Sequence, residues 1–355
     1  MSRFLPMLTA AVLSGAAVGS AAPAPVLPGD YVTGSFALYR SLFMTSDGRI
    51  VDKENGGISH SEGQGYGMLM AVAANDRAAF DDLWAWTKRE LFLREDGLAA
   101  WKWDPSATPH VADRNNATDG DLLIAWALLR AGHRWEAPDL RDAALALADA
   151  IAEHAVLHTD EGAMLLPGVD GFAEGRPGAP VVNLSYWVMP AIAELAAASP
   201  NFADLHLEAS GARLAARLAE AGYPLAPDWA ALGGEAIGPA DGFEPLSGYN
   251  AVRVPLYFAW ASRDNAAIVA PYAKAYSAPK PNDGPAVFRL SPDEAVPVEP
   301  MLDPGYQALV DALVCSLGEQ AKAPATAAFA PTTYYASTLH ILSQMALSER
   351  YPQCL

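Results

Sequence analysis

The sequence predicts an all-α fold in which an inner ring of helices is surrounded by an outer ring. Some segments repeat their apolar residues with the period of a helix, as Leu140, Ala144, Leu147 and Ile151 do, and such amphipathic helices lie at a protein surface. Other segments, such as 122–129, are apolar on nearly every face, as helices in a protein interior are. The interior type precedes the surface type several times along the chain, which favours an α/α toroid.

Pairs of interior and surface helices extend over most of the chain. We expect helices at 31–45, 64–74, 78–92, 118–131, 139–155, 185–198, 203–220, 249–261, 264–276, 304–317 and 334–347. Alternating strand patterns are scarce, which disfavours a fold of βαβ units. Segments rich in Pro and Gly at 156–182, 222–247 and 277–302 are expected to be long loops around a cleft of one domain, 23–355, because helix pairs continue across them. A two-domain helical protein is the alternative.

The first 22 residues have the layout of a secretory signal peptide. One basic residue, Arg3, precedes the apolar run 4–18, and the small residues 19–22 follow it. A membrane anchor is the weaker interpretation, because the run is short and rich in Ala and Gly. We therefore expect an exported protein, periplasmic or secreted, with no stable membrane insertion.

The composition narrows the possible partners. Asp and Glu number 41 against 23 Lys and Arg, a net charge of −18, which disfavours nucleic acid and anionic membrane. Nine Trp and thirteen Tyr in a chain with only 18% charged residues suit a neutral, ring-shaped ligand such as a sugar. Cys315 and Cys354 fit an oxidising compartment, and their pairing stays open. His154 and His158 are interpreted as surface residues, so we expect no metal and no cofactor.

The stretch 60–67 precedes an interior helix and is the most unusual part of the sequence. It places Glu62 and Tyr66 among three glycines, which let a backbone or a ligand approach closely. The alternative is a purely structural cap, in which Ser61 caps the helix and Glu62 lies near its positive end. If Glu62 is a proton donor, apolar cover or a neighbouring carboxylate must hold its proton.

Two further stretches carry polar groups at the start of interior helices. Asp119 and Asp121 open the helix at 118–131, where a single N-cap requires one such residue. Trp101 and Trp103 precede them in a polar loop and suit a sugar-stacking platform. Arg253 falls near the start of the apolar helix at 249–261, and a buried Arg requires a partner such as a carboxylate.

These motifs resemble those of glycoside hydrolase family 8 over about residues 28–348. The family's Ser-Glu-Gly-x-x-Tyr-Gly motif appears at 61–67, and its Ala-[Ser/Thr]-Asp-[Ala/Gly]-Asp signature appears from Ala117 onward to Trp135. The resemblance implies an (α/α)6 barrel with a substrate cleft. It also implies an endo-acting cellulase that cleaves β-1,4-glucan, similar to the exported endoglucanases linked to the bacterial cellulose synthase machinery.

The resemblance also implies roles for individual residues. Glu62 corresponds to the general acid, and Asp119 to the signature aspartate, a nucleophile or a group that steadies the distorted sugar ring. The remaining positions are expected to line the cleft and bind substrate: Tyr66, Trp101, Trp103, Asn116, Tyr186, Trp187, Tyr249, Asn250, Arg253, Tyr334 and Tyr335.

One departure concerns the general base. Many family members have Tyr-Asp-Ala-x-Arg where this chain has Tyr249-Asn250-Ala251-Val252-Arg253, and an amide cannot take a proton from water as that Asp does. The base stays open among Asp119, Glu235, Asp241 and Glu244. The family inverts configuration, which requires two carboxyl groups roughly 6.5–9.5 Å apart. Chitosan, mixed-linkage glucan (lichenan) and xylan are alternative substrates, and a non-catalytic glycan-binding scaffold is the alternative outside enzymes.

Overall fold

The computed structural model describes residues 30–233, 237–278, 285–318 and 328–355. The expected signal peptide at 1–22 lies outside the described residues, as does Glu235. Within the described part of the chain, no helix is both long enough and apolar enough to cross a membrane.

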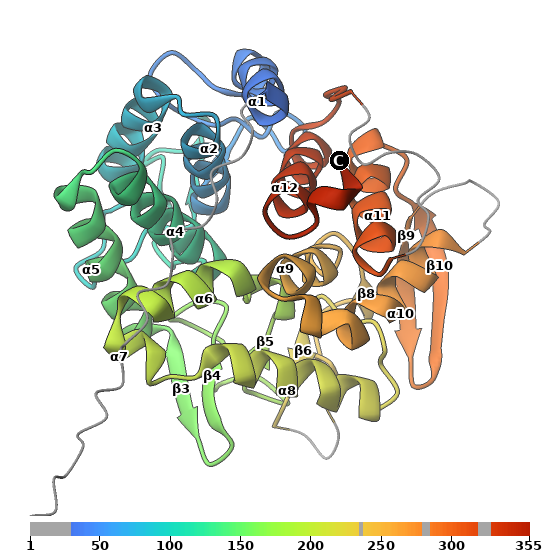
Figure 1. Ribbon diagram of the computed structural model, residues 1–355. Coiled ribbons are helices and arrows are strands. Elements are labelled where there is room, and N and C mark those ends of the chain that lie inside the picture. Colours follow the sequence, from blue (N-terminus) through green and yellow to red (C-terminus); the bar gives the residue numbers. More distant parts are fainter. Residues whose placement is uncertain (1–29, 234–236, 279–284, 319–327) are drawn as a thin grey trace, which may run out of the picture.

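The predicted double ring of helices is confirmed. The inner ring consists of α2 (Ser61–Ala73), α4 (Thr118–Arg134), α6 (Met189–Ala198), α9 (Arg253–Ala261) and α12 (Tyr334–Arg350). Each of these helices packs against the next, and α12 returns to α2, so that the ring closes (Figure 1). The surrounding helices are α1 (Asp30–Phe43), α3 (Arg77–Glu90), α5 (Pro138–His154), the short α7 (Pro200–Ala203), α8 (Leu207–Glu220) and α10 (Ala266–Ser277). Helix α11 (Pro304–Ser316) packs against α9, α10 and α12.

Burial follows the two sequence patterns. Helix α4 buries every residue from Thr118 to Leu129, whereas α5 buries only its stripe of Leu140, Ala144, Leu147, Ala148 and Ile151. The apolar helices are therefore interior because neighbours cover all their faces, and the amphipathic ones cover them with a single face. One continuous apolar core runs through both rings.

Several expected helices begin later than predicted. The helix expected from 185 begins at Met189, because Leu184–Tyr186 forms a 3-10 turn capped by the side chain of Asn183. The helix expected from 203 begins at Leu207, because His206 has a left-handed backbone conformation with φ of 50°. The helix expected from 249 begins at Arg253, which leaves Tyr249 and Asn250 in the preceding loop.

The long segments expected to be loops contain short strands, and that prediction was wrong for them. In 156–182, β3 (Val156–Thr159) and β4 (Gly162–Leu165) form a hairpin. In 277–302, β9 (Ala286–Ser291) pairs with β10 (Glu294–Pro300) and with β8 (Leu246–Ser247). Two further sheets join β1 (Ser59–His60) to β2 (Lys102–Trp103), and β5 (Val181–Val182) to β6 (Ala230–Ala231) and β7 (Gly238–Pro239). Strands this short carry too few residues to show alternation in a sequence.

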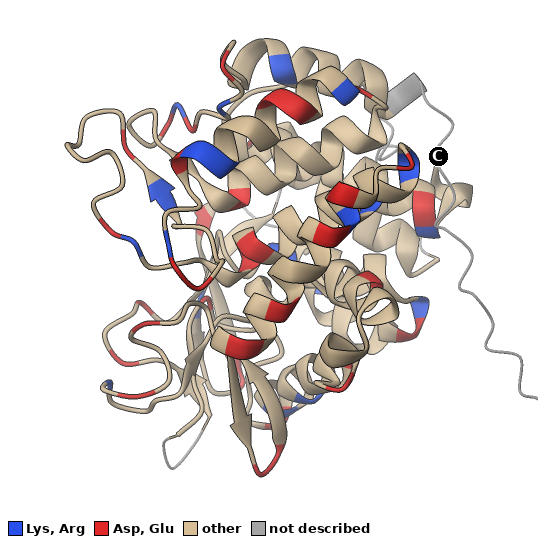
Figure 2. Cartoon of the chain, turned by 90° about the vertical axis from the view of Figure 1, so that its left-hand side faces the viewer, with Lys and Arg blue, Asp and Glu red and all other residues tan. Residues whose placement is uncertain are grey.

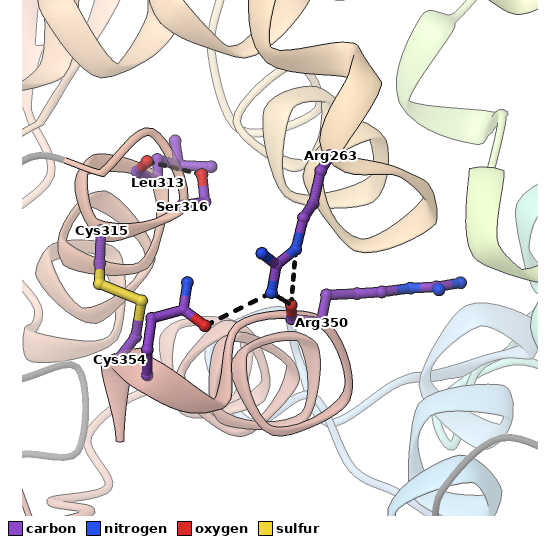
Figure 3. Close-up of a disulfide and its surroundings, with 7 residues drawn as sticks. Arg263, Leu313, Cys315, Ser316, Arg350 and Cys354 are labelled. Atoms are coloured by element: carbon purple, nitrogen blue, oxygen red, sulfur yellow. Dashed lines mark hydrogen bonds between the residues drawn. A yellow bond between two sulfur atoms is a disulfide. The ribbon is translucent and has the colours of Figure 1, made fainter.

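The open question of the cysteines is answered by a disulfide between Cys315 and Cys354 (Figure 3). It joins the last turn of α11 to the chain end that follows α12. Arg263 holds the same region, because its Nε atom donates to the Arg350 carbonyl at 3.0 Å. The acidic surplus is not concentrated in one run: Figure 2 shows Asp and Glu on several helices and loops, with Lys and Arg among them.

Candidate active site

The N-terminal ends of α2, α4 and α9 meet, and their first residues supply the charged groups of the candidate site. Glu62 is the second residue of α2, Asp119 the second of α4, and Arg253 the first of α9. A helix N-terminus favours negative charge, so two such ends stabilise the two carboxylates. The chain thus brings together three residues that are far apart in sequence.

Arg253 links both carboxylates. Its Nη1 atom donates to Asp119 Oδ2 at 3.0 Å and forms an ion pair with Glu62 Oε1. Its Nη2 atom donates to Ser185 Oγ at 3.0 Å and to Asn250 Oδ1 at 3.1 Å. The prediction that a buried Arg at this position pairs with a carboxylate is confirmed.

Glu62 and Asp119 differ in exposure. The side chain of Glu62 is 17% exposed, whereas that of Asp119 is only 2% exposed. Burial raises the pKa of the Asp119 carboxyl above its usual range, and the Gly120 N–H, which donates to it at 2.8 Å, opposes this shift. Of the two carboxylates, Glu62 is therefore the one that a ligand in solution can reach.

The close approach of α2 and α4 depends on Gly120. A Cβ atom at this position would lie 2.1 Å from Ser61 Oγ and 2.7 Å from the Glu62 backbone nitrogen. Any side chain here would push the two helix starts apart, so the glycine sets how near Asp119 lies to Glu62.

The N-cap of α2 is His60. The purely structural alternative had expected Ser61 in this role. His60 Nδ1 accepts a hydrogen bond from the Gly63 N–H at 3.1 Å. The same atom lies 3.7 Å from Glu62 Oε2, and His60 Nε2 lies 3.6 Å from Asp52 Oδ2. Sequence reasoning missed the contact of His60 with Glu62 and that of Asp52 with His60.

Part of the expected substrate-binding set is half-buried or exposed around these charges. The backbone of Trp101 lies next to that of Ser61, the neighbour of Glu62, because its carbonyl accepts from the Ser61 N–H at 3.0 Å. Tyr186 lies with its ring 5.7 Å from the Arg253 guanidinium carbon. Tyr335, in the first turn of α12, donates to the Tyr249 carbonyl at 2.7 Å. Trp103 is largely enclosed, since Arg49 lies over its ring and Trp86 and His110 lie against it.

Besides Arg253, four residues expected to contact substrate are buried, and for these four the structure corrects the expectation of direct contact. Trp187 is fully buried, because the turn at 184–186 directs it into the core against Gly211. Tyr334 is buried among Tyr39, Phe43 and His60.

The other two, Tyr66 and Asn116, hydrogen-bond to the carboxyl groups of Glu62 and Asp121. Tyr66 is fully buried and donates to Glu62 Oε1 at 3.2 Å, and its hydroxyl lies 2.7 Å from that of Tyr257. Asn116 donates to Asp121 Oδ2 at 2.9 Å and accepts from the Val169 N–H at 2.7 Å, so it ties two chain segments together.

The segment before β6 contains a half-buried carboxylate that contacts the loop before α9 and that sequence reasoning also missed. Asp228 Oδ1 accepts from the N–H groups of Gly248 at 2.9 Å and Ala251 at 2.8 Å. Burial raises the pKa of Asp228, and the backbone donors and the Asn250 side chain oppose this shift. An Asp in the segment just before Asn250 was the available signal, but nothing in the sequence separates it from its exposed neighbours.

The candidates for the general base are placed differently. Asp241 is exposed on a turn, and Glu244 is 72% exposed and pairs with Arg289 at 3.1 Å. Asp119 binds the same guanidinium nitrogen as Glu62. The contacting oxygens of that pair therefore lie closer together than the roughly 6.5–9.5 Å that an inverting pair needs.

Comparison with known proteins identifies the family of the chain. The family model "Glycosyl hydrolases family 8" matches residues 1–349. A probable endoglucanase of Novacetimonas hansenii is 35% identical over 97% of this chain and 99% of its own length. Among solved structures, the family 8 endoglucanase Cel10 of Klebsiella pneumoniae is 35% identical, with a TM-score of 0.78 over 89% of this chain and 99% of that one. The endo-β-1,4-glucanase CMCax of Acetobacter xylinum is 33% identical, with a TM-score of 0.76 over 91% and 99%.

A double ring of helices with paired carboxylates at the starts of two inner helices defines an (α/α)6-barrel glycoside hydrolase. The chain belongs to glycosyl hydrolase family 8.

Proposed function

We propose that the protein is an endo-acting β-1,4-glucanase that hydrolyses its substrate with inversion and uses Glu62 as the general acid. The observation that carries the proposal is the single guanidinium of Arg253 between Glu62 and Asp119. Full-length likeness to enzymes named endoglucanase supports the substrate class.

The charge balance of this cluster supports the acid role. Two carboxylates share one cation in a buried setting, so burial favours a state in which the pair retains one proton. Of the two carboxyl groups, Glu62 is the one that substrate can reach. A proton held on Glu62 can therefore be donated to the substrate. It would pass to the glycosidic oxygen as the bond to the anomeric carbon breaks.

The groups around Glu62 suit a hydroxyl-rich chain of flat rings. Trp101 and Tyr186 are half-buried aromatics that could stack on successive glucose units, and Tyr249, which is 43% exposed, extends this series. Asn250 is half-buried beside Arg253, where it could orient a water. Export and a functional link to a cellulose synthase machinery remain predictions of the sequence.

The test combines substrate and stereochemistry. Purified enzyme is incubated with soluble cellulose derivatives, chitosan, mixed-linkage β-glucan and xylan, and the initial anomer is read by proton NMR. We expect fastest release of new reducing ends from β-1,4-glucan and α-anomeric product. Faster release from another polymer would change the substrate, and β-anomeric product would indicate a retaining route through Asp119. Binding of cello-oligosaccharide with no release of reducing ends would indicate a scaffold.

A further inference from the structure

We propose that Asp228 is a positioning residue that fixes the orientation of the Asn250 side chain, and through it the Arg253 contact to the carboxylate pair. The inference rests on the proposed function only for its kinetic readout. Asp228 is half-buried and acts through Asn250.

The anchoring of the loop is the first step of the argument. Asp228 accepts from the N–H groups of Gly248 and Ala251, which flank Tyr249 and Asn250 on both sides. Its own N–H donates to the Leu246 carbonyl at 2.7 Å. A Cβ atom at Gly248 would lie 3.0 Å from Asp228 Oδ2, so the loop backbone closes directly on the carboxylate.

The orientation of the Asn250 amide is the second step. The Asn250 side chain lies at the Asp228 carboxylate, where hydrogen bonding from it lowers the pKa of that carboxyl, and its Oδ1 atom accepts from Arg253 Nη2 at 3.1 Å. A carboxylate can only accept and a guanidinium can only donate. The amide therefore has one arrangement that satisfies both neighbours, with Nδ2 toward Asp228 and Oδ1 toward Arg253.

This arrangement gives a physical reason for an amide at position 250. An ionised carboxylate there would face the carboxylate of Asp228, and two carboxylates that share a site cannot both ionise easily. One anion and one amide satisfy the same contacts without repulsion. Asp228 and Asn250 therefore act as a matched pair.

Exchange of the two groups tests the pairing. Asp228→Asn still offers an oxygen to the two backbone N–H groups but sets one amide against another. We expect kcat to fall by roughly 10- to 100-fold with KM nearly unchanged, the loss that follows from a misplaced catalytic contact. Asn250→Asp should lose activity by a similar factor. Asp142→Asn, an exposed carboxylate on α5, is the matched control and should behave as the wild type.

The double exchange, Asp228→Asn with Asn250→Asp, restores one carboxylate and one amide. If the two positions acted independently, the losses in kcat of the single variants would multiply. We expect the kcat of the double variant to be about tenfold or more above the value calculated in that way. Wild-type kcat in Asp228→Asn, or a double variant at the product of the singles, overturns the proposal. Should Asp228→Asn not fold, Asn250→Ala removes the same bridge from the other side and should lower kcat comparably; an unchanged kcat there also overturns it.

Denaturant unfolding of the same four proteins of the exchange cycle supplies a readout without substrate. Coupling between positions 228 and 250 in the free energy of unfolding supports the contact even where the wild type cleaves no β-1,4-glucan. In that case the proposed function fails and this inference stands. The opposite result is that the wild type cleaves β-1,4-glucan but positions 228 and 250 show no coupling in kcat or in the free energy of unfolding. That result overturns this inference and leaves the proposed function standing.

Discussion

Arg253 Nη1 lies 3.0 Å from Asp119 Oδ2 and pairs at the same time with Glu62, so one buried cation holds the starts of α2 and α4 together. The guanidinium is only 3% exposed, and its second nitrogen is engaged by Ser185 and Asn250. The geometry of the carboxylate pair and the stability of the inner ring therefore depend on the same residue.

Removal of the cation should therefore cost stability as well as activity. In Arg253→Met, the buried Asp119 and the partly exposed Glu62 lose their shared cation, and we expect the free energy of unfolding at pH 7 to fall by about 3–5 kcal/mol. The loss should be smaller near pH 4, where the carboxylates can be protonated. Urea unfolding at both pH values measures this, and an equal loss at both would contradict the ion-pair account.

Gly120→Ala should separate Glu62 from Asp119. The added Cβ would meet Ser61 and the Glu62 backbone, and overpacking of this kind costs about 1–3 kcal/mol. We expect kcat to fall further than this loss of stability explains, because the carboxylate pair is displaced. Gly34→Ala on α1 is the control, since a Cβ there meets nothing within 4 Å. A fully active Gly120→Ala enzyme would show that the approach of the two helices is not required.

Trp101 and Trp187 should respond in opposite ways. Trp101→Ala should raise KM about tenfold, the effect of roughly 1.4 kcal/mol of lost stacking, with little change in unfolding. Trp187→Ala should instead lower the free energy of unfolding by about 3–5 kcal/mol, because it removes a fully buried ring. Steady-state kinetics and denaturant unfolding of both variants check this. A rise in KM in Trp187→Ala but not in Trp101→Ala would instead support the expectation that Trp187 contacts substrate.

Asp121 should make stability depend on pH. Burial raises the pKa of this carboxyl to about 7, so the folded state holds its proton at pH values where the unfolded chain has lost it. Its contribution to stability is full below about pH 4 and is lost as pH rises to about 7. In Asp121→Asn, the free energy of unfolding should decrease less between about pH 4 and pH 7 than in the wild type. Asp142→Asn, at an exposed position on α5, is the control and should decrease as the wild type does. Parallel slopes for wild type and Asp121→Asn would contradict the burial argument.

Most of the fold and the charged centre could be predicted from the sequence. Apolar residues on every face of 122–129 and a single stripe on α5 encode interior and surface directly. Glu62, Asp119 and Arg253 stand at helix starts, where motif and position agree. The short strands were missed because two to seven residues carry little periodic signal.

The roles of the aromatics and of Asp228 could not be predicted, because they depend on contacts between distant segments. Tyr186 and Trp187 are adjacent, and only the 3-10 turn at 184–186 decides which one faces Arg253 and which enters the core. Asp228 has a function only because residues 248–251 fold back onto it.

The proton donor role of Glu62 is tested most directly by the dependence on the leaving group. Glu62→Gln is compared with wild type on cello-oligosaccharides and on an aryl cello-oligoside whose phenol leaves without protonation. We predict a loss of turnover on cello-oligosaccharides of roughly 100-fold or more and a much smaller loss on the activated aryl substrate. Equal losses on the two substrates, or near wild-type turnover on cello-oligosaccharides, would contradict the assignment of Glu62 as the general acid.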